Sequence, residues 1–398
     1  MISYEEALRE VLAVAASLGD EALPLAEAHG RVLARDILAP FPLPRFTNSA
    51  VDGFAVAETD LRSVGSPLKI ERTVAAGDPP GEELKPGTAV RIFTGAPTPP
   101  GTAAVAMQED VLVDGSFVTL QETLRHGAHV RIQGEEFSAG AVALPRGLRL
   151  NSAGVSLAAM LGLDQVWVHR PPKIGVLTTG AELVGVGEHA EPHQIYESNS
   201  YAMQAELGRL GLAATVVRRI SDDLQETVSA VEDSLSRCDV LVTTGGVSVG
   251  GHDVLKAAFE HLGVETVFWK VAIKPGKPVF FGKQGQRVVF GLPGNPMSAL
   301  VTFRLFARPY LLATLGVENP VPACYESKLS ARISHKAGRR EFIPAEADGK
   351  SVRAISGQGS HMMGGLAVAN ALIDMPADVE ELEAGSLVRV LPFAEACL

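Results

Sequence analysis

The chain has 398 residues, of which 46% are hydrophobic and 20% charged, so it is long enough for several domains and has no compositional mark of disorder. Its 46 acidic residues outnumber its 35 basic ones, and the formal charge of -11 would repel a nucleic-acid backbone, so we expect no nucleic-acid partner. No apolar stretch approaches the roughly 18 residues that a membrane span needs, and the 3 cysteines match neither a disulfide framework nor a zinc motif. These features predict a cytoplasmic protein with no membrane partner.

The N-terminal segment predicts an amphipathic helix followed by extended chain. In MISYEEALREVLAVAASLGD the apolar residues recur at helical spacing, and acidic residues stand where a signal peptide would be basic. The stretch from Arg31 to Val56 is rich in proline and predicts a strand, an extended linker and a polar loop. In that loop Asp52 precedes Gly53, which on local evidence is an ordinary turn dipeptide.

From about Ile70 to Leu150 the sequence consists of short β-rich runs separated by Gly, Pro and Asp turns. This pattern predicts a small all-β insertion. Thr94 begins TGAPTPPG, which by itself is only a Pro/Gly loop. A short helical segment from Asn151 to Leu163 then leads into the basic, proline-marked linker HRPPK.

From Lys173 onward, strand and helix patterns alternate, which predicts a doubly wound, mainly parallel sheet. KIGVLTTG and DVLVTTG are buried-strand runs, and we expect a long helix from Ala299 to Leu315. Two other helices should start at polar caps: Ser198 or Asn199 for the first, Ser221 or Asp222 for the second. Residues from about 320 to 398 return to short strands and predict a small β-barrel or sandwich.

The stretch VLVTTGGVSVGGHDVLK passes from a strand to a helix through a glycine-rich loop. Loops at the carboxyl ends of parallel strands bind ligands, and bare backbone N–H groups there suit phosphate or another oxyanion. The spacing matches neither a Walker A motif nor G-x-G-x-x-G, so a tight turn is the alternative interpretation. The loop residues that suit an anion are Gly245, Gly246, Ser248 and Gly250.

Two carboxylates follow TTG strand ends. Asp253, after the glycine loop, fits either a helix cap or a ligand of Mg²⁺, which takes one or two carboxylates together with substrate phosphates. Glu182, after KIGVLTTG, is the second candidate metal ligand. The two strand ends would have to lie side by side for both to serve one site.

Basic and polar residues in three later stretches are candidates for anion binding. Lys270, Lys274 and Lys277 lie in FWKVAIKPGKPV among apolar residues, where an unpaired ammonium would be costly, so we favour a functional role over surface solvation. Arg339 with Arg340, and Ser360 in GQGSH, are weaker candidates by themselves.

Taken in order, these stretches resemble the molybdopterin molybdenumtransferase (MoeA-type) family, which includes the C-terminal domain of gephyrin. The resemblance spans nearly the whole chain and implies that molybdate is inserted into the dithiolene of adenylylated molybdopterin. The adenylate would be cleaved in a Mg²⁺-dependent step, giving molybdenum cofactor and AMP. The stretches that carry the resemblance are SAVDGFAV, TGAPTPPG, TTGAEL, YESN, SDD, TTGGVSVGGHD, WKVAIKPGKP, GLPGNP and GQGSH.

The resemblance also implies a multidomain fold of the α/β plus all-β class, assembled as an elongated homodimer. The site would lie between the α/β domain of one chain and N-terminal elements of the other, and an adenylyltransferase would supply the substrate. The expected parts are an extended N-terminal linking domain at 1–45 and 136–170, a β-rich inserted domain at 46–135, a central doubly wound α/β molybdopterin-binding domain at 171–318, and a C-terminal β-barrel domain at 319–398.

Carried over residue by residue, the resemblance implies catalytic acids at Asp52, Glu182, Asp222 and Asp253, with Glu182 and Asp253 as metal ligands. The implied substrate contacts are Thr94, Gly245, Gly246, Ser248, Lys270, Lys274, Lys277, Arg340 and Ser360. Arg339 could take the place of Arg340. Two rival functions remain open: a molybdopterin adenylyltransferase, which shares the α/β domain, and a non-catalytic, gephyrin-like scaffold.

Overall fold

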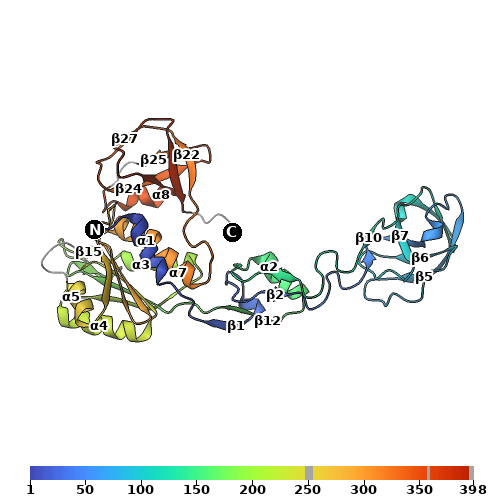
Figure 1. The fold of residues 1–398 in the computed structure, drawn as a ribbon, viewed down its shortest axis with the longest axis horizontal. Coiled ribbons are helices and arrows are strands. Elements are labelled where there is room, and N and C mark those ends of the chain that lie inside the picture. The colour runs from blue at the N-terminus through green and yellow to red at the C-terminus, as the bar shows by residue number, and fades with distance from the viewer. Residues whose placement is uncertain (247–253, 356–358, 394–398) are drawn as a thin grey trace. The chain divides into compact units, whose positions relative to one another are not determined.

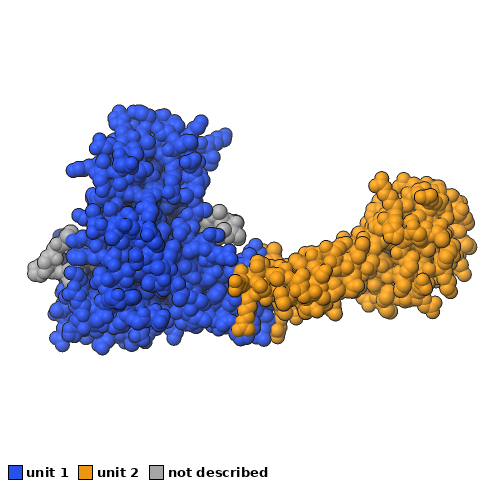
Figure 2. All heavy atoms as spheres, in the orientation of Figure 1, with its two compact units in different colours: residues 1–34, 147–151, 165–398 blue, residues 35–146, 152–164 orange. Residues whose placement is uncertain are grey.

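The computed structural model describes residues 1–246, 254–355 and 359–393 (Figure 1). Ser248, Gly250 and Asp253, all predicted as site residues, lie outside the described residues. Figure 2 shows the two compact units of the chain: unit 1 comprises residues 1–34, 147–151 and 165–398, and unit 2 comprises residues 35–146 and 152–164. Within the described ranges, no helix is long and apolar enough to cross a membrane.

Unit 1 contains an α/β domain built on a sheet with strand order β16-β13-β17-β21-β20-β18. The first four of these strands pair in parallel, whereas β20 and β18 complete the sheet with antiparallel pairs. Every residue of β13 and of β17 is buried, which explains their continuous apolar sequence. The predicted doubly wound, mainly parallel domain is confirmed. Its strands are β13 (Ile174–Thr179), β16 (Ala214–Ile220), β17 (Val240–Thr244), β18 (Glu265–Trp269), β20 (Phe280–Gln284) and β21 (Arg287–Leu292).

Helices cover both faces of this sheet (Figure 1). Val176 and Val242 pack with residues of α1, α3, α6 and α7, while Leu177 and Leu241 pack with residues of α4 and α5. Successive residues of a strand face opposite sides, so each strand contributes to both layers. The helices are α1 (Tyr4–Ala13), α3 (Asn199–Arg209), α4 (Leu224–Arg237), α5 (Val254–His261), α6 (Pro296–Thr302) and α7 (Arg308–Thr314).

Local side-chain hydrogen bonds determine where two of these helices begin. Ser3 and Glu6 form a reciprocal capping box at α1, which satisfies two backbone N–H groups of its first turn. At α4 the cap is Asp223, whose carboxylate accepts a hydrogen bond from the N–H of Glu226 at 2.9 Å. The predicted cap at Ser221 or Asp222 is therefore wrong, because Asp223 is the extended residue directly before the helix.

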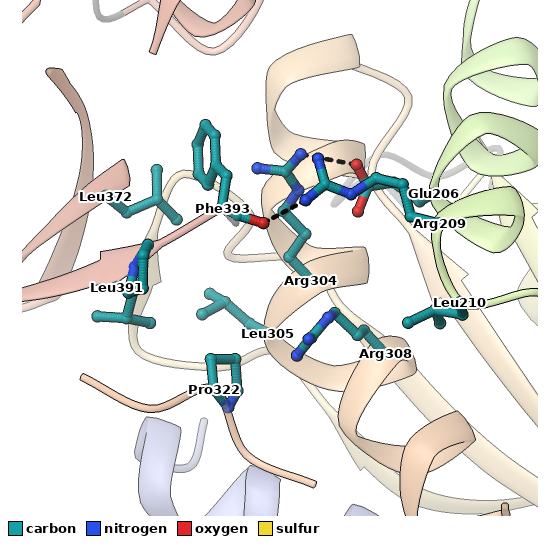
Figure 3. Close-up of a pocket in the computed structure, with 11 residues that line it drawn as sticks. Glu206, Arg209, Leu210, Arg304, Leu305, Arg308, Pro322, Leu372, Leu391 and Phe393 are labelled. Atoms are coloured by element: carbon teal, nitrogen blue, oxygen red, sulfur yellow. Dashed lines mark hydrogen bonds and ion pairs between the residues drawn. The ribbon is translucent and has the colours of Figure 1, made fainter. Parts of the chain in front are cut away.

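The helix predicted from Ala299 to Leu315 is interrupted. A π-helical turn, Phe303–Ala307, separates α6 from α7. Pro309 lies in the first turn of α7 and has no N–H to donate to the preceding turn, so a regular α-helical ladder cannot run through this point. Arg304 lies within this turn, and Arg308 is the first residue of α7 (Figure 3).

The C-terminal part of unit 1 is a closed β-barrel. Strands β24, β25, β22, β28 and β26 follow one another, and β26 pairs again with β24, which confirms the barrel alternative. Strand β19 leaves the α/β domain and pairs in parallel with β24 at the edge of the barrel. The bounds are β19 (Ile273–Lys274), β22 (Tyr325–Leu329), β23 (Ile333–Ser334), β24 (Arg340–Ala347), β25 (Ser351–Ala354), α8 (Met363–Val368), β26 (Ala371–Met375), β27 (Glu381–Leu382) and β28 (Leu387–Pro392). Unit 1 also holds the pair β1 (Asp20–Pro24) and β12 (Gln165–His169).

Unit 2 is β-rich, as predicted for this part of the chain. Its main sheet has the strand order β7-β4-β6-β5-β9-β8 and buries the apolar faces of Phe54, Val56 and Val118. The bounds are β4 (Gly53–Ala57), β5 (Pro67–Val74), β6 (Thr88–Ile92), β7 (Thr102–Met107), β8 (Val111–Asp114) and β9 (Phe117–Leu120). Short pairs join β2 (Ile37–Leu38) to β11 (Val142–Leu144) and β3 (Asn48–Ser49) to β10 (Val130–Arg131), and α2 spans Ser152–Met160. The boundaries expected near residues 45, 135, 170 and 318 stay predictions.

Candidate active site

A cleft of about 790 Å³ opens beyond the carboxyl ends of β13, β17 and β21 in unit 1. Open parallel sheets bind ligands at this edge, and the volume is in the range of small-molecule sites. Two short strands, β14 (Leu183–Val184) and β15 (Ile195–Tyr196), form part of its wall. The polar and glycine residues that line the cleft are Thr179, Gly180, Glu182, Glu197, Ser198, Asn199, Asp222, Gly245, Gly246, Gly294, Asn295 and His361.

The two TTG strand ends lie side by side, as a shared site requires: β13 pairs with β17 through Thr178 and Thr244. The approach is so close that a Cβ at Gly245 would lie 2.4 Å from the carbonyl oxygen of Thr179. Gly245 and Gly246 also have positive φ, so other residues would be strained there. Both glycines line the cleft, and their close approach to β13 gives them a structural role in addition to the predicted anion contact.

Glu182 and Asp222 meet at one side of the cleft. The Asp222 carboxylate accepts a hydrogen bond from the N–H of Ala181 at 3.0 Å and so holds the loop that carries Glu182. The Glu182 carboxylate folds back over Gly180, where an added Cβ would lie 2.8 Å from its oxygen. From the sequence, Glu182 was expected at a strand end and Asp222 as a helix cap or, through the resemblance, a catalytic acid; the structure brings both to one cleft.

Two buried polar residues of the cleft wall were missed as site residues. Asn199 donates from its amide nitrogen to Thr244 Oγ1 at 3.2 Å and to the Gly294 carbonyl at 2.8 Å. Its Oδ1, like Thr179 Oγ1, is buried and has no hydrogen-bond partner among the described residues. From the sequence, Asn199 was expected only as a helix cap, although its place in YESN, just after a strand, was the available signal.

A second cavity, of about 440 Å³, adjoins the cleft and shares Pro278, Pro293 and Asn295 with it. Asn295, at the N-cap position of α6, donates from its side chain to Ser360 Oγ at 2.9 Å. The structure thus gathers three of the predicted substrate contacts, Lys274, Lys277 and Ser360, in this cavity. The polar residues that line this cavity are Lys274, Lys277, Asn295, Ser298, Arg339, Glu341 and Ser360.

Lys274 is held by a buried carboxylate. Its ammonium lies 2.7 Å from Glu341 Oε1, and the side chains are 46% and 4% exposed, respectively. The other Glu341 oxygen lies 3.2 Å from Nδ1 of His335. The lysine therefore has a fixed position at the cavity wall and keeps part of its charge accessible.

Arg340 does not line this cavity; it forms an ion pair with Asp374 at 2.5 Å and another with Glu5. Successive strand residues face opposite sides, so when Glu341 of β24 points to Lys274, Arg340 must point away. Arg339, just before the strand, lines the cavity instead. The structure thus places Arg339, the alternative considered from the sequence, beside Lys274.

Lys270 lies apart from both cavities as the described residues outline them. Its φ is +72°, and its ammonium lies 4.0 Å from the centre of the Trp269 ring. This is a cation–π geometry. Its predicted contact with substrate stays a prediction.

Asp52 and Thr94 form a local pair within unit 2. The N–H and the hydroxyl of Thr94 donate to Asp52 Oδ1 at 2.7 and 2.8 Å. These hydrogen bonds hold the pKa of Asp52 below its ordinary value, and the bond from the backbone N–H has the larger effect. The carboxylate is fully charged near neutral pH and is oriented by Thr94.

Hard oxygen ligands for a divalent cation are present in the cleft. Glu182 and Asp222 are carboxylates on its wall, although no cluster of three or more His, Cys, Asp or Glu side chains fit for a metal occurs among the described residues. Mg²⁺ needs only one or two carboxylates when substrate phosphates supply the remaining ligands. The donor set therefore fits Mg²⁺.

Comparison with known proteins covers nearly the whole chain. Residues 2–162 match the family described as "MoeA N-terminal region (domain I and II)", residues 175–313 the "Probable molybdopterin binding domain", and residues 326–393 the "MoeA C-terminal region (domain IV)". The chain is 37% identical to a molybdopterin molybdenumtransferase of Haemophilus influenzae, with 94% of each chain covered. It is 35% identical to molybdopterin molybdenumtransferase 2 of Mycobacterium tuberculosis, with 98% of this chain and 99% of that one covered. A crystal structure of a molybdopterin biosynthesis protein from Pyrococcus horikoshii superposes with a TM-score of 0.85 at 31% identity, with 99% of each chain covered.

Proposed function

The chain belongs to the molybdopterin molybdenumtransferase (MoeA-type) family, and we propose that its cleft binds adenylylated molybdopterin while the adjoining cavity binds molybdate. The chain transfers molybdenum to molybdopterin in the biosynthesis of molybdenum cofactor. The adenylated form of the substrate, the Mg²⁺ requirement, the homodimer, the supplying adenylyltransferase and the cytoplasmic location are parts of the proposal.

One observation carries the assignment of the two substrates: a large cleft and a smaller basic cavity adjoin and share three wall residues. Lys274, Lys277 and Arg339 give the cavity positive charge, and Glu341 is the acid among its described lining residues. An oxyanion such as molybdate is stabilised by such point charges and donors. It would lie next to whatever occupies the cleft, which is what a transfer between the two ligands requires.

The cleft offers complementary groups for a pterin nucleotide. Asn199 Oδ1 and Thr179 Oγ1 are buried acceptors without a partner among the described residues, so a ligand N–H would remove the cost of leaving them unsatisfied. The loop at Gly245 and Gly246 presents backbone without side chains, which suits a phosphate. Glu182, steadied through the contact of Asp222 with Ala181, would hold the cation.

In the proposed reaction this chain's residues mainly position and neutralise charge. Lys274 holds the oxyanion at a fixed place because Glu341 restrains its ammonium. Asp222 orients the loop that carries Glu182. When bound, Mg²⁺ would neutralise the charge of the phosphoanhydride during its cleavage.

A turnover assay tests the proposal and separates it from its rivals. Incubation with adenylylated molybdopterin, molybdate and Mg²⁺ should release AMP and yield molybdenum cofactor. Glu182→Gln should weaken Mg²⁺ binding and so raise the Mg²⁺ concentration that half-maximal release requires. If molybdopterin and ATP alone accumulate the adenylate, the chain is an adenylyltransferase instead. The absence of any turnover in a folded, substrate-binding chain would favour the scaffold function.

A further inference from the structure

A chain of contacts leads from the Lys274 ammonium through Glu341 to a buried histidine. Lys274 of β19 and Glu341 of β24 are paired strand residues, and Lys274 Nζ lies 2.7 Å from Glu341 Oε1. Glu341 Oε2 lies 3.2 Å from Nδ1 of His335. The His335 and Glu341 side chains are only 2% and 4% exposed, so water is largely excluded from their contact. We call Lys274, Glu341 and His335 the Lys274 triad.

Main-chain hydrogen bonds fix the place of His335. The residue follows β23, which pairs with β27, and its N–H donates to the carbonyl oxygen of Glu380 at 2.9 Å. Nε2 of its ring faces the carbonyl oxygen of Val379. Both ring nitrogens therefore face oxygen atoms, one from a carboxylate and one from a carbonyl group.

These oxygen atoms determine which ring nitrogens carry protons. A carbonyl oxygen can only accept a hydrogen bond, so Nε2 must be the donor. In a neutral ring, Nδ1 would then direct a lone pair at the Glu341 carboxylate, which is also an acceptor. One more proton must lie in this contact. The Lys274 ammonium at the other oxygen favours the ionised carboxylate, so the proton belongs on Nδ1.

Other charged groups near His335 have their own partners or are exposed. Arg332, just before β23, forms an ion pair with Glu381 of β27. Arg340, next to Glu341, pairs with Asp374. On either side of Val379, Asp378 and Glu380 are exposed to water. Among the described contacts, Glu341 is therefore the counter-ion of the ring.

Glu341 is shared by two cations, one at each oxygen. Lys274 is the partner of Oε1 and His335 the partner of Oε2, so loss of either cation leaves one oxygen of a buried carboxylate without its partner. With the ring charged, the triad keeps one net positive charge beside the basic cavity. That charge adds to the attraction for an anion in the cavity.

We propose that His335 is a positively charged positioning residue of the basic cavity: its imidazolium holds Glu341, and Glu341 holds Lys274 at the cavity wall. This role rests on the proposed function, in which the cavity binds molybdate. His335 does not itself line the cavity and acts through the other two members of the triad. Loss of the Nδ1 proton sets a lone pair against the carboxylate and removes the net charge, so molybdate binding should weaken as the ring deprotonates.

NMR of the imidazole nitrogens tests the charge of the ring directly. The His335 signals are assigned by their absence from His335→Asn, and at neutral pH they should show protons on both nitrogens. Signals of a neutral ring, with one protonated nitrogen, would overturn the proposal. This measurement needs neither substrate nor turnover, and it uses the parent chain.

Calorimetric titration with molybdate over a range of pH tests the positioning role. His335→Asn keeps an amide N–H near the place of Nδ1 but carries no charge; His335→Gln, whose amide can reach the Val379 carbonyl, takes its place if His335→Asn does not fold. His126→Asn is the matched control, because Nδ1 of His126 also contacts a glutamate, Glu58, but in unit 2 and with the histidine 74% exposed.

At neutral pH the His335 variant should bind molybdate about tenfold more weakly than the parent, the size of effect that the loss of an outer partner has at a binding site. The parent affinity should fall over the pH interval in which the ring signals change, and the variant should lack this step. Equal affinities of parent and variant, or the same pH dependence in both, would overturn the role of His335. A parent that binds no molybdate at any pH contradicts the proposed function of the cavity and this role with it.

Discussion

At the scale of single residues, Lys274 connects the fold to the proposed chemistry. Its ammonium pairs with Glu341, which is almost completely buried, and it also faces the basic cavity. Removing one partner of such a pair leaves a buried charge without compensation. We therefore expect the lysine to contribute to stability and to anion binding, and the two contributions can be separated.

We predict that Lys274→Gln weakens molybdate binding about 10- to 100-fold, since a charge-assisted contact contributes roughly 1.5–3 kcal/mol. The melting temperature should fall as well, because Glu341 loses its cation. The double variant Lys274→Gln/Glu341→Gln should recover the melting temperature but not the affinity. Lys283→Gln, at a lysine that pairs with Glu265 and is 38% exposed, is the control and should change neither quantity. Normal molybdate affinity in Lys274→Gln would assign the lysine a purely structural role.

A second residue-scale prediction concerns the pair of Asp52 and Thr94. Thr94→Val removes the hydroxyl donor but keeps the backbone N–H, so the pKa of Asp52 should rise toward its ordinary value while staying below it. Because the pKa of Asp52 is lower in the folded chain, this contact stabilises the fold above the ordinary pKa and loses its effect as the pH falls through the folded value. NMR titration of the carboxylate carbon measures the shift, and an unchanged pKa would show that the hydroxyl has no part in it.

At the scale of elements, the turn after β19 packs tightly against α6. A Cβ at Gly276 would lie 2.2 Å from Cγ2 of Thr302, and the φ of Gly276 is +98°. We predict that Gly276→Ala lowers the free energy of unfolding by about 1–3 kcal/mol through strain and overpacking. Thr302→Ser deletes the clashing methyl group and keeps the hydroxyl that donates to Ser298, so it should recover part of this loss in the double variant. Denaturant unfolding of the parent, the two single variants and the double variant measures the coupling between positions 276 and 302. If the two changes in the free energy of unfolding simply add, the clash is relieved elsewhere.

The strands and helices of the α/β domain could be predicted because their apolar patterns are long and regular. Side-chain contacts between distant segments could not be predicted. Asp223 and not Asp222 caps α4, and the interruption at Phe303–Ala307 goes with Pro309, whose missing N–H the apolar helical pattern does not express. The choice between Arg339 and Arg340 depended on the register of β24 against β19, which is a property of the sheet.

In the candidate site, too, some residues could be predicted from the sequence and others could not. Glycines, lysines and acids at strand ends were visible because their types and positions suit anion and metal binding. Asn199 was not, because its buried oxygen matters only once Thr244 and Gly294 are seen to occupy its amide group. Long-range pairing, which sequence spacing does not specify, decides which polar atoms remain available to a ligand.

At the scale of the whole molecule, the expected homodimer leads to a quantitative prediction about the activity of mixed variants. Asp52 lies in unit 2, whereas Glu182 lines the cleft of unit 1. In the proposed shared site, Asp52 of one chain completes the cleft of its partner. Asp52→Ala and Glu182→Ala homodimers should each be inactive, and light scattering should show that both remain dimeric.

Mixing these two inactive chains after controlled dissociation distinguishes a shared site from a site within one chain. In a symmetric dimer with shared sites, a heterodimer carries both substitutions in one site and neither in the other, so one site is intact. Random pairing makes about half of the dimers heterodimeric, and activity should return to roughly a quarter of the parent value. If Asp52 and Glu182 of the same chain formed the site, every site in the mixture would keep one substitution and no activity would return. Heterodimers verified by mass spectrometry that stay inactive would therefore refute the shared site, and mixing either variant with itself provides the baseline.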